Sequence, residues 1–506
     1  MPAIMPTSPP HKPPTPLRRL IVPTLILLVT LSVAAPAQAP PLNLPDLGNA
    51  ADTRQHAEKL RRMGQALYLE LKRRDNLLTD PQIQSYLSDL GARLALHSDL
   101  PPRAMTFFAL RDQSLNAFAA PGGYIGIHAG LMLKLSHESE VAAVLAHEIA
   151  HITQKHLDRS LANAATFSPQ LAIGILAAAL IGSQGHQLGQ AALAGALGAH
   201  ARRQIQFTRS YESEADRIGI RLLARAGFPA RRMAQTFSRL RQLDRFTADG
   251  LPDYLRTHPV DEHRVAESLN RAAQLPDNHD PDNRLFRMMQ ARIRLITSGN
   301  LIDLQEKTSA ALLGDRQAPF DEADRDGLLF QAALLALALD DVAKSKRALS
   351  QLSDTGQALL PPQLLAIEQL RAAGDDIRAN RNADRLATLY PGHPAVILAR
   401  LDQLLRERQF QQTYDLAAKT ARILPEHSGI IARQSQAASA LGQPLKATLL
   451  LAEHYRLEFQ YHRALALLSE AEANFDDATD PITAARILAK RQDIERLIEL
   501  ATLIDS

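Results

Sequence analysis

The chain has 506 residues, of which 46% are hydrophobic and 22% charged, as in globular proteins built from two or three domains. Its 57 basic and 54 acidic residues leave a net charge of only +3, which argues against nucleic acid as a partner. Because Cys is absent, disulfide bonds and thiolate metal sites are excluded, so any metal ligands must be His or carboxylate side chains.

Residues 1–39 have the pattern of a secretory signal peptide. Arg18 and Arg19 precede an apolar run over 20–34, and the small residues that follow fit cleavage near 37–39. An uncleaved anchor is the alternative, but the apolar run is short for a bilayer span and contains Pro23. We therefore expect a secreted protein, and a bacterial periplasm is the compartment most consistent with this reading.

Two short extended runs are expected within residues 116–127. Asn116, Ala117 and Phe118 begin the first run, and a turn at 121–123 (Pro-Gly-Gly) separates it from the second. An edge strand of this kind can pair with an extended peptide substrate through its backbone. A purely structural hairpin is the alternative.

Residues 136–151 carry the main chemical signal, a predicted helix that ends in the sequence HEIAH. Ser136 is the candidate N-cap, and apolar residues recur at helical spacing along the segment. His147 and His151 are four residues apart, so their imidazoles project from one face and can share one Zn²⁺. Glu148 lies beside them, where it can reach a metal-bound water without binding the metal.

A third ligand is expected at the start of another amphipathic helix, over 211–219. Glu212 and Asp216 are four residues apart and share a helix face, so one can bind the metal while the other supports a ligand His. Glu214 competes for the ligand role on spacing alone. Between this helix and the HEIAH helix, residues 161–206 are rich in Ala, Gly and Leu, and they suit a lid, a membrane contact or a packed helix.

A domain boundary is expected at 276–283, a polar segment that Pro interrupts twice. Beyond it, residues 284–506 show helical periodicity only. Pro391 and Pro425 each precede a helix pair and are 34 residues apart, and further pairs are expected near 325, 361 and 462. This period is that of tetratricopeptide repeats, whose concave side binds protein; a generic helical bundle is the alternative.

The HEIAH and ESEADRIG segments resemble the metallopeptidase family of the CAAX prenyl endopeptidases and the HtpX heat-shock proteases. In that family an E-x-x-x-D motif follows the HExxH helix. The resemblance implies that Glu212 is the third metal ligand beside His147 and His151, and that Asp216 is its companion in the catalytic site with Glu148. Residues 116–123 (NAFAAPGG) are similar to a further family stretch, N-A-F-x-x-P-G-G.

Residues 257–264 resemble a third family segment, T/S-H-P-x-x-x-x-R. The resemblance implies that His258 is a regulatory fourth ligand, which keeps the site inactive until it is displaced, and that Arg264 orients nearby carboxylates or the substrate. The remaining histidines near these motifs have no such support, and we expect them to be structural or solvent-facing: His128, His137, His156, His186, His200 and His263.

These patterns predict an α+β zincin-like metallopeptidase domain at 40–275, mostly helical with a small sheet, followed by an all-α tetratricopeptide-like solenoid at 284–506. We expect one Zn²⁺ per chain and a zinc-dependent endopeptidase in which Glu148 activates the water. A chaperone or adaptor with a closed structural zinc site is the alternative. A membrane-embedded prenyl-protein protease is disfavoured because the sequence lacks the several transmembrane spans that such family members carry.

The resemblance also implies the cellular setting. Secreted family members with a helical-repeat tail suggest misfolded or stalled outer-membrane β-barrel proteins as substrates, together with a chaperone role. The repeats would dock to the β-barrel assembly machinery in the periplasm, with the protein soluble or peripherally associated with the outer membrane.

Overall fold

The structure is a computed structural model that describes residues 50–163, 209–244, 253–314, 321–425, 427–473 and 481–505. The expected signal peptide at 1–39 and nearly all of the Ala/Gly/Leu-rich segment 161–206 lie outside the described residues. Residues 54–506 cluster as one compact unit. None of the described helices combines the length and the apolar composition that a membrane crossing requires.

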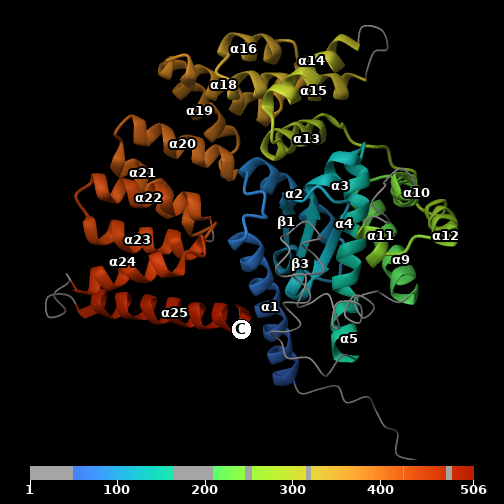
Figure 1. Ribbon diagram of the computed structural model, residues 1–506, viewed down its shortest axis with the longest axis horizontal. Coiled ribbons are helices and arrows are strands. Elements are labelled where there is room, and N and C mark those ends of the chain that lie inside the picture. The colour runs from blue at the N-terminus through green and yellow to red at the C-terminus, as the bar shows by residue number, and fades with distance from the viewer. Residues whose placement is uncertain are drawn as a thin grey trace, which may run out of the picture. The chain divides into compact units, whose positions relative to one another are not determined.

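A three-stranded sheet forms the centre of the first half of the chain (Figure 1). The strand order is β1 (Thr106–Leu110), β3 (Tyr124–His128) and β2 (Ala117–Ala120), with β3 parallel to β1 and antiparallel to β2. The predicted hairpin is therefore confirmed. Gly122 and Gly123 between its strands have φ of 72° and 87°, the left-handed region that glycine adopts without strain.

Helices pack on and around this sheet: α2 on β1, and α4 on β2 and β3. The helices of this half, with two 3₁₀ turns, are α1 (Ala50–Arg73), α2 (Pro81–Ala95), η1 (Pro102–Ala104), η2 (Pro121–Gly123), α3 (Ala129–Lys134), α4 (Glu138–Thr153), α5 (His156–Asn163), α9 (Arg209–Arg225), α10 (Arg232–Asp244), α11 (Asp253–Thr257) and α12 (Glu262–Ala272). Helices α9 and α10 lie beside α4 (Figure 1).

Helix α4 is the buried HEIAH helix, and most of its residues are inaccessible to solvent. Its N-cap is His137, so the prediction of Ser136 was wrong by one residue. The Glu140 carboxylate accepts the backbone N–H groups of Ser136 at 2.6 Å and of His137 at 3.1 Å. It thereby satisfies backbone donors that a helix start leaves without partners.

Helices α4 and α9 approach each other closely because α9 carries Gly219 at the crossing. A Cβ at this position would lie 3.2 Å from the backbone carbonyl of Ala146 and 3.0 Å from the Met233 side chain. Any larger residue would push the two helices apart. The crossing thus sets the distance between the HEIAH residues and the acidic residues one turn and more before Gly219.

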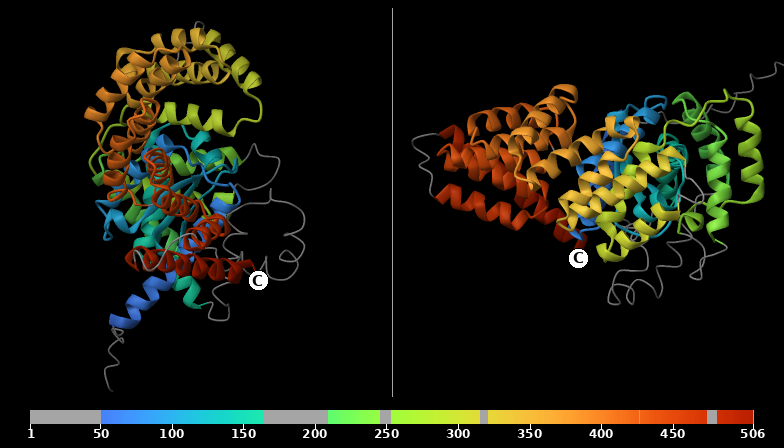
Figure 2. Two further views of the ribbon diagram at one scale, coloured as in Figure 1. Left: turned by 90° about the vertical axis from the view of Figure 1, so that its left-hand side faces the viewer. Right: turned by 90° about the horizontal axis from the view of Figure 1, so that it is seen from above.

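The described residues beyond 283 form helices joined by turns, without strands, as predicted. From α14 onward each helix packs against a neighbour in sequence, whereas α13 packs against α15, from yellow to red in Figures 1 and 2. These helices are α13 (Arg284–Thr297), α14 (Leu301–Gly314), α15 (Glu322–Ala338), α16 (Val342–Ser350), α17 (Asp354–Ala358), α18 (Leu360–Ala372), α19 (Asp376–Leu389), α20 (Pro394–Arg406), α21 (Phe410–Ala421), α22 (Ser428–Ala440), α23 (Pro444–Leu457), α24 (Tyr461–Ala473) and α25 (Pro481–Asp505).

A regular period runs through these helices. Alternate helices begin at Leu360, Pro394, Ser428 and Tyr461, so the steps are 34, 34 and 33 residues. The turns inside the pairs keep the same step, because the residues with positive φ at 340, 374, 408 and 442 are each 34 apart. At every one of these turns the next residue donates its backbone N–H to the carbonyl five positions earlier, which is a Schellman closure.

The polar segment 276–283 has no helix or strand, as predicted, yet it is fastened to the first half of the chain. Asn278 donates its amide to the carbonyls of Ala224 and Phe228, and Asp280 pairs with Arg232 at 2.6 Å. Asn283 accepts the backbone N–H of Glu138 at the start of α4. One hydrophobic core extends from α2 and α4 across this segment into α13 and α15.

Candidate metal centre

Four buried side chains from three places in the sequence converge on one point. Helix α4 supplies His147 and His151, α9 supplies Glu212, and His258 follows α11 directly. Each side chain offers one nitrogen or oxygen atom, and these four atoms all lie within 4.8 Å of one another. Such a convergence of unlinked polar atoms in a protein interior is costly unless a cation or protons join them.

The separations between these atoms match the edges of a small coordination polyhedron. His147 Nε2 lies 3.0 Å from His151 Nε2, 3.3 Å from His258 Nδ1 and 3.4 Å from Glu212 Oε2. Glu212 Oε1 lies 3.3 Å from His151 Nε2 and 3.0 Å from His258 Nδ1. Metal–ligand bonds of about 2.0–2.1 Å place neighbouring tetrahedral donors about 3.3–3.4 Å apart, so these separations are compatible with donors that share one divalent ion.

A buried ion-pair network contacts two residues of the cluster, His147 and Glu212. The Asp216 carboxylate lies 3.0 Å from His147 Nδ1, the ring nitrogen that faces away from the cluster. Arg264 grips the same carboxylate with two hydrogen bonds of 2.8 Å and reaches Glu212 Oε2 at 2.8 Å. The predicted companion of the ligands therefore contacts a ligand, and Arg264 joins the carboxylates of Glu212 and Asp216 on α9.

The charges of this network favour a cation at the cluster. Burial alone would raise the pKa of Glu212, but His258, His147 and His151 hold that pKa well below its usual range. Burial alone would lower the pKa of His147, yet the Asp216 and Glu212 carboxylates raise it to about 10. In the metal-free protein, a proton on His147 thus supplies the positive charge beside the Asp216 and Glu212 carboxylates that a bound metal cation would otherwise supply.

Glu148 lies next to the cluster without joining it. Its carboxylate is fully buried, and Oε1 is 3.6 Å from His258 Nε2. Neither carboxylate oxygen has a hydrogen-bond partner among the described residues. Burial raises the pKa of Glu148, and the neighbouring His258 and His147 offset only part of that effect. A raised pKa makes this carboxylate a stronger proton acceptor, as a general base must be.

A second pair of polar side chains, His156 and Glu214, lies on the side of His151 that faces away from the cluster. His156 at the start of α5 is fully buried, and its Nδ1 lies 3.0 Å from His151 Nδ1. Its Nε2 lies 3.1 Å from the carboxylate of Glu214, which is therefore turned to His156 and is not among the cluster residues. His156 has no motif that identifies it in sequence, because the contact depends on a turn and on a distant helix.

The predicted substrate-binding run lies at an edge of the sheet. Ala117 and Phe118 are in β2, which pairs with β3 on one side within the described sheet and packs against α4. The side chains of both residues are buried, as is that of Asn116 just before the strand. The edge position is compatible with backbone pairing to a peptide, whereas the buried side chains also serve the core.

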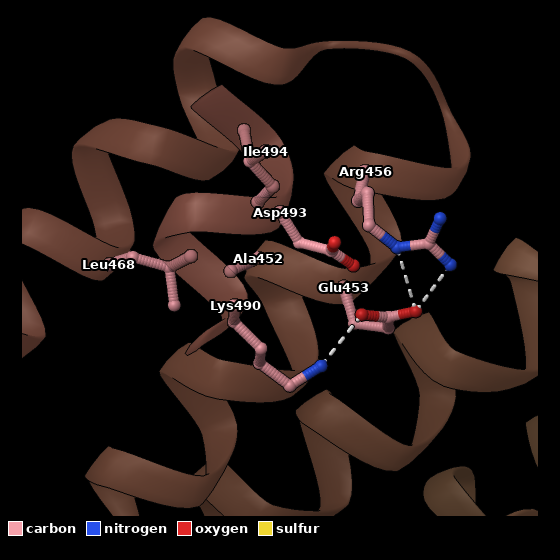
Figure 3. A pocket seen from close by; sticks show the side chains of 7 residues that line it. All are labelled: Ala452, Glu453, Arg456, Leu468, Lys490, Asp493 and Ile494. Atoms are coloured by element: carbon pink, nitrogen blue, oxygen red, sulfur yellow. Dashed lines mark hydrogen bonds and ion pairs between the residues drawn. The ribbon is translucent and has the colours of Figure 1, made fainter. Parts of the chain in front are cut away.

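A separate pocket of about 300 Å³ opens between α23, α24 and α25, far along the chain from the metal centre (Figure 3). Three of its charged side chains are paired with one another: the Glu453 carboxylate lies 2.6 Å from Arg456 and 2.8 Å from Lys490. Although burial would raise the pKa of Glu453, the two cations lower it to about 2. We assign this pocket no role in the chemistry.

Comparison with known proteins decides the nature of the first half of the chain. Residues 81–272 match the model of peptidase family M48, and this range contains all four cluster residues, Glu148 and Asp216. The chain carries an M48 metallopeptidase domain.

Relatives extend beyond this domain. The β-barrel assembly-enhancing protease of Escherichia coli is 29% identical over 461 residues, which cover 90% of this chain and 93% of that protein. A protein of Vibrio cholerae that provisionally bears the same name is 38% identical over 271 residues, 53% of this chain and 56% of its own length. The mitochondrial metalloendopeptidase OMA1 of Arabidopsis thaliana is 28% identical over 220 residues, 43% of this chain and 42% of its own.

Proposed function

We propose that the M48 domain uses Zn²⁺, held by His147, His151 and Glu212, to cleave internal peptide bonds of protein substrates. The observation that carries the proposal is the mutual spacing of these donors, 3.0–3.4 Å, at a buried site with a mixed imidazole and carboxylate set. Zinc favours such donors in tetrahedral arrangement, and three protein ligands are typical of its catalytic sites. When bound, Zn²⁺ lowers the pKa of a coordinated water and polarises the substrate carbonyl.

The residues around the metal then have distinct tasks. Glu148 accepts a proton from the attacking water on a carboxylate oxygen and returns it to the leaving amide nitrogen. Asp216 accepts the Nδ1 proton of His147 and so orients its ring, and Arg264 holds Asp216 in place. The β2 edge, with Asn116, Ala117 and Phe118, presents backbone groups that pair with an extended substrate.

His258 supports a second candidate function for the same fold. With its Nδ1 in the cluster, the four protein donors form a closed set, which is typical of structural zinc sites. A chaperone or adaptor with structural zinc would need no more than this. We favour His258 as a regulatory fourth ligand instead, because Glu148 is fully buried beside the cluster, 3.6 Å from His258, where a general base would lie.

The relatives support a proposal for domain roles, substrates and location. The E. coli relative is named for enhancing β-barrel assembly, and its alignment includes most of the helical half of this chain. We infer a signal peptide at 1–39, a peptidase domain at 40–275, a linker at 276–283 and tetratricopeptide-like repeats at 284–506. We infer a periplasmic protease, with peripheral membrane contact, that acts on misfolded or stalled outer-membrane β-barrel proteins and assists their folding, with the repeats docked to the β-barrel assembly machinery.

The test compares zinc content and casein cleavage in the wild type, Glu148→Gln and His258→Ala. Glu148→Gln should retain zinc and lose about 10²–10⁴-fold in cleavage rate, because only the proton acceptor is removed. Glu138→Gln, at the far end of the same helix, is the matched control and should cleave at the wild-type rate.

Undiminished cleavage by Glu148→Gln would defeat the endopeptidase proposal. His258→Ala separates the two roles of the fourth donor. Faster cleavage by this variant supports the regulatory role, whereas unchanged or slower cleavage removes it. Loss of zinc from His258→Ala, together with loss of client binding, would favour the structural site.

A further inference from the structure

A chain of buried polar contacts leads from the metal cluster to the surface through His156 and Glu214. His151 Nδ1 and His156 Nδ1 are 3.0 Å apart, and His156 Nε2 is 3.1 Å from Glu214 Oε2. This series of contacts ends at the Glu214 side chain, which is 32% exposed to solvent. Glu214 also lies 3.8 Å from Arg217. The mechanism proposed above uses neither His156 nor Glu214.

The order of these contacts fixes the position of each proton. If His151 binds a metal through Nε2, its Nδ1 must carry the proton and act as donor. His156 must then accept that bond at its own Nδ1, which leaves its proton on Nε2. That Nε2–H points at a carboxylate, which can only accept. All three groups are therefore satisfied by one arrangement, with His151 donating to His156 and His156 donating to Glu214.

The local backbone is shaped to hold His156 at this place. Lys155, between α4 and α5, has φ of 54°, a left-handed conformation that costs free energy for a residue with a side chain. At this turn α4 ends and α5 begins, so that His156, the first residue of α5, lies against His151, the last ligand of α4. The His156 ring also stacks on Tyr211 of α9, with ring centres 4.5 Å apart and planes within 9°.

The two histidine ligands consequently differ in the group that contacts the ring nitrogen facing away from the metal cluster. Behind His147 stands a carboxylate that is itself bound by Arg264. Behind His151 stands a neutral acceptor, with the carboxylate one residue further away. An acceptor behind a metal-bound imidazole orients the ring and strengthens it as a ligand, and the loss of such a partner weakens metal binding.

We propose that His156 and Glu214 are positioning residues for the metal centre: His156 fixes the tautomer and ring orientation of His151, and Glu214 fixes those of His156. This inference rests on the proposed function in one respect, namely that His151 binds Zn²⁺. Neither residue touches substrate, so their removal should act on metal affinity first and on cleavage through it.

The experiment measures the Kd of the full-length protein for Zn²⁺ by competition with a chromophoric chelator of known affinity. His156→Leu removes both polar atoms and should weaken Zn²⁺ binding about 10–100-fold. His156→Asn places an amide oxygen where Nδ1 stood, so it keeps the acceptor for His151 and should lose less than about 10-fold. His156→Gln reaches toward Glu214 instead and should lose as much as His156→Leu.

The matched control is His128→Leu. His128 is equally buried, but its Nδ1 lies 2.8 Å from the Ser114 hydroxyl, and it is not among the cluster residues. This variant loses a buried imidazole and should keep the wild-type Kd. Thermal unfolding of the metal-free proteins, recorded in parallel, shows how much stability each variant loses without Zn²⁺.

Each outcome decides the matter. A ranking in which His156→Asn binds Zn²⁺ more tightly than His156→Leu and His156→Gln supports the positioning role. Wild-type affinity in His156→Leu, or equal losses in all three variants, overturns it. A wild-type protein without affinity for Zn²⁺ would overturn the proposed function and this inference together, so the two failures are distinguishable.

Discussion

Arg264 shows how much one side chain contributes to the metal centre. Its guanidinium contacts Asp216 with two hydrogen bonds, reaches Glu212, and donates to the carbonyl of Pro259 just after His258. It thus ties α9 to the loop that carries the fourth donor. The ring of Phe237 covers the same guanidinium, 4.8 Å from its centre, so water has little access to the pair.

We expect Arg264→Met to lower the free energy of unfolding of the metal-free protein by about 3–5 kcal/mol, because it removes the guanidinium that pairs with two buried carboxylates. Urea unfolding at pH 7 measures the change. Lys307→Met is the control: its pair with Asp303 spans 2.7 Å but is well exposed, so less than about 1 kcal/mol should be lost. A loss below 1 kcal/mol for Arg264→Met would contradict the role of the pair.

Residues of this centre differ in how far the sequence could predict them. His147, Glu148 and His151 lie on one turn of one helix, so their spacing predicts that they converge. Glu212 and Asp216 lie far along the chain, and their choice over Glu214 needed a resemblance to a known family. His156 could not be foreseen, because its contact with His151 depends on the left-handed Lys155 and on the side chains of α9.

At the scale of elements, the 34-residue repeat is kept more strictly by the backbone conformation of the turns inside the helix pairs than by the residue types at those turns. The left-handed positions at 340, 374, 408 and 442 are occupied by Asp, Gly, Arg and Gly. Backbone geometry therefore repeats where residue type does not.

Gly442→Ala should destabilise the helical half by about 1 kcal/mol. A Cβ on Gly442 would meet no atom within 4 Å, so the cost comes only from the left-handed backbone, which φ of 70° requires. Thermal unfolding of full-length protein measures it. Gly392→Ala is matched, because that Cβ also meets no atom and Gly392 does not have positive φ; it should be neutral or slightly stabilising. Equal effects of both substitutions would refute the argument.

For the whole molecule, the segment 276–283 separates two sequence patterns but does not separate two cores. Composition and Pro content predict a boundary there, and they cannot reveal what the helices beyond it cover. Phe286 on α13 is fully buried in the core that contains α4. Gln290 donates its amide to the carbonyls of Met132 and Leu135 at 2.7 and 2.8 Å, and it thereby caps the C-terminal end of α3.

A chain cut after residue 275 should consequently fail to unfold cooperatively, although it contains every residue of the metal centre. It would expose the core surface that α13 and α15 cover, and it would lose Asn283, which caps the HEIAH helix. A chain cut after residue 373 keeps α13 to α18 and should unfold in one calorimetric transition and bind Zn²⁺ as the full chain does. If the shorter chain instead unfolds in one transition and binds Zn²⁺ with unchanged affinity, the peptidase half is independent of the helices that follow it, and the shared core contributes little to the site.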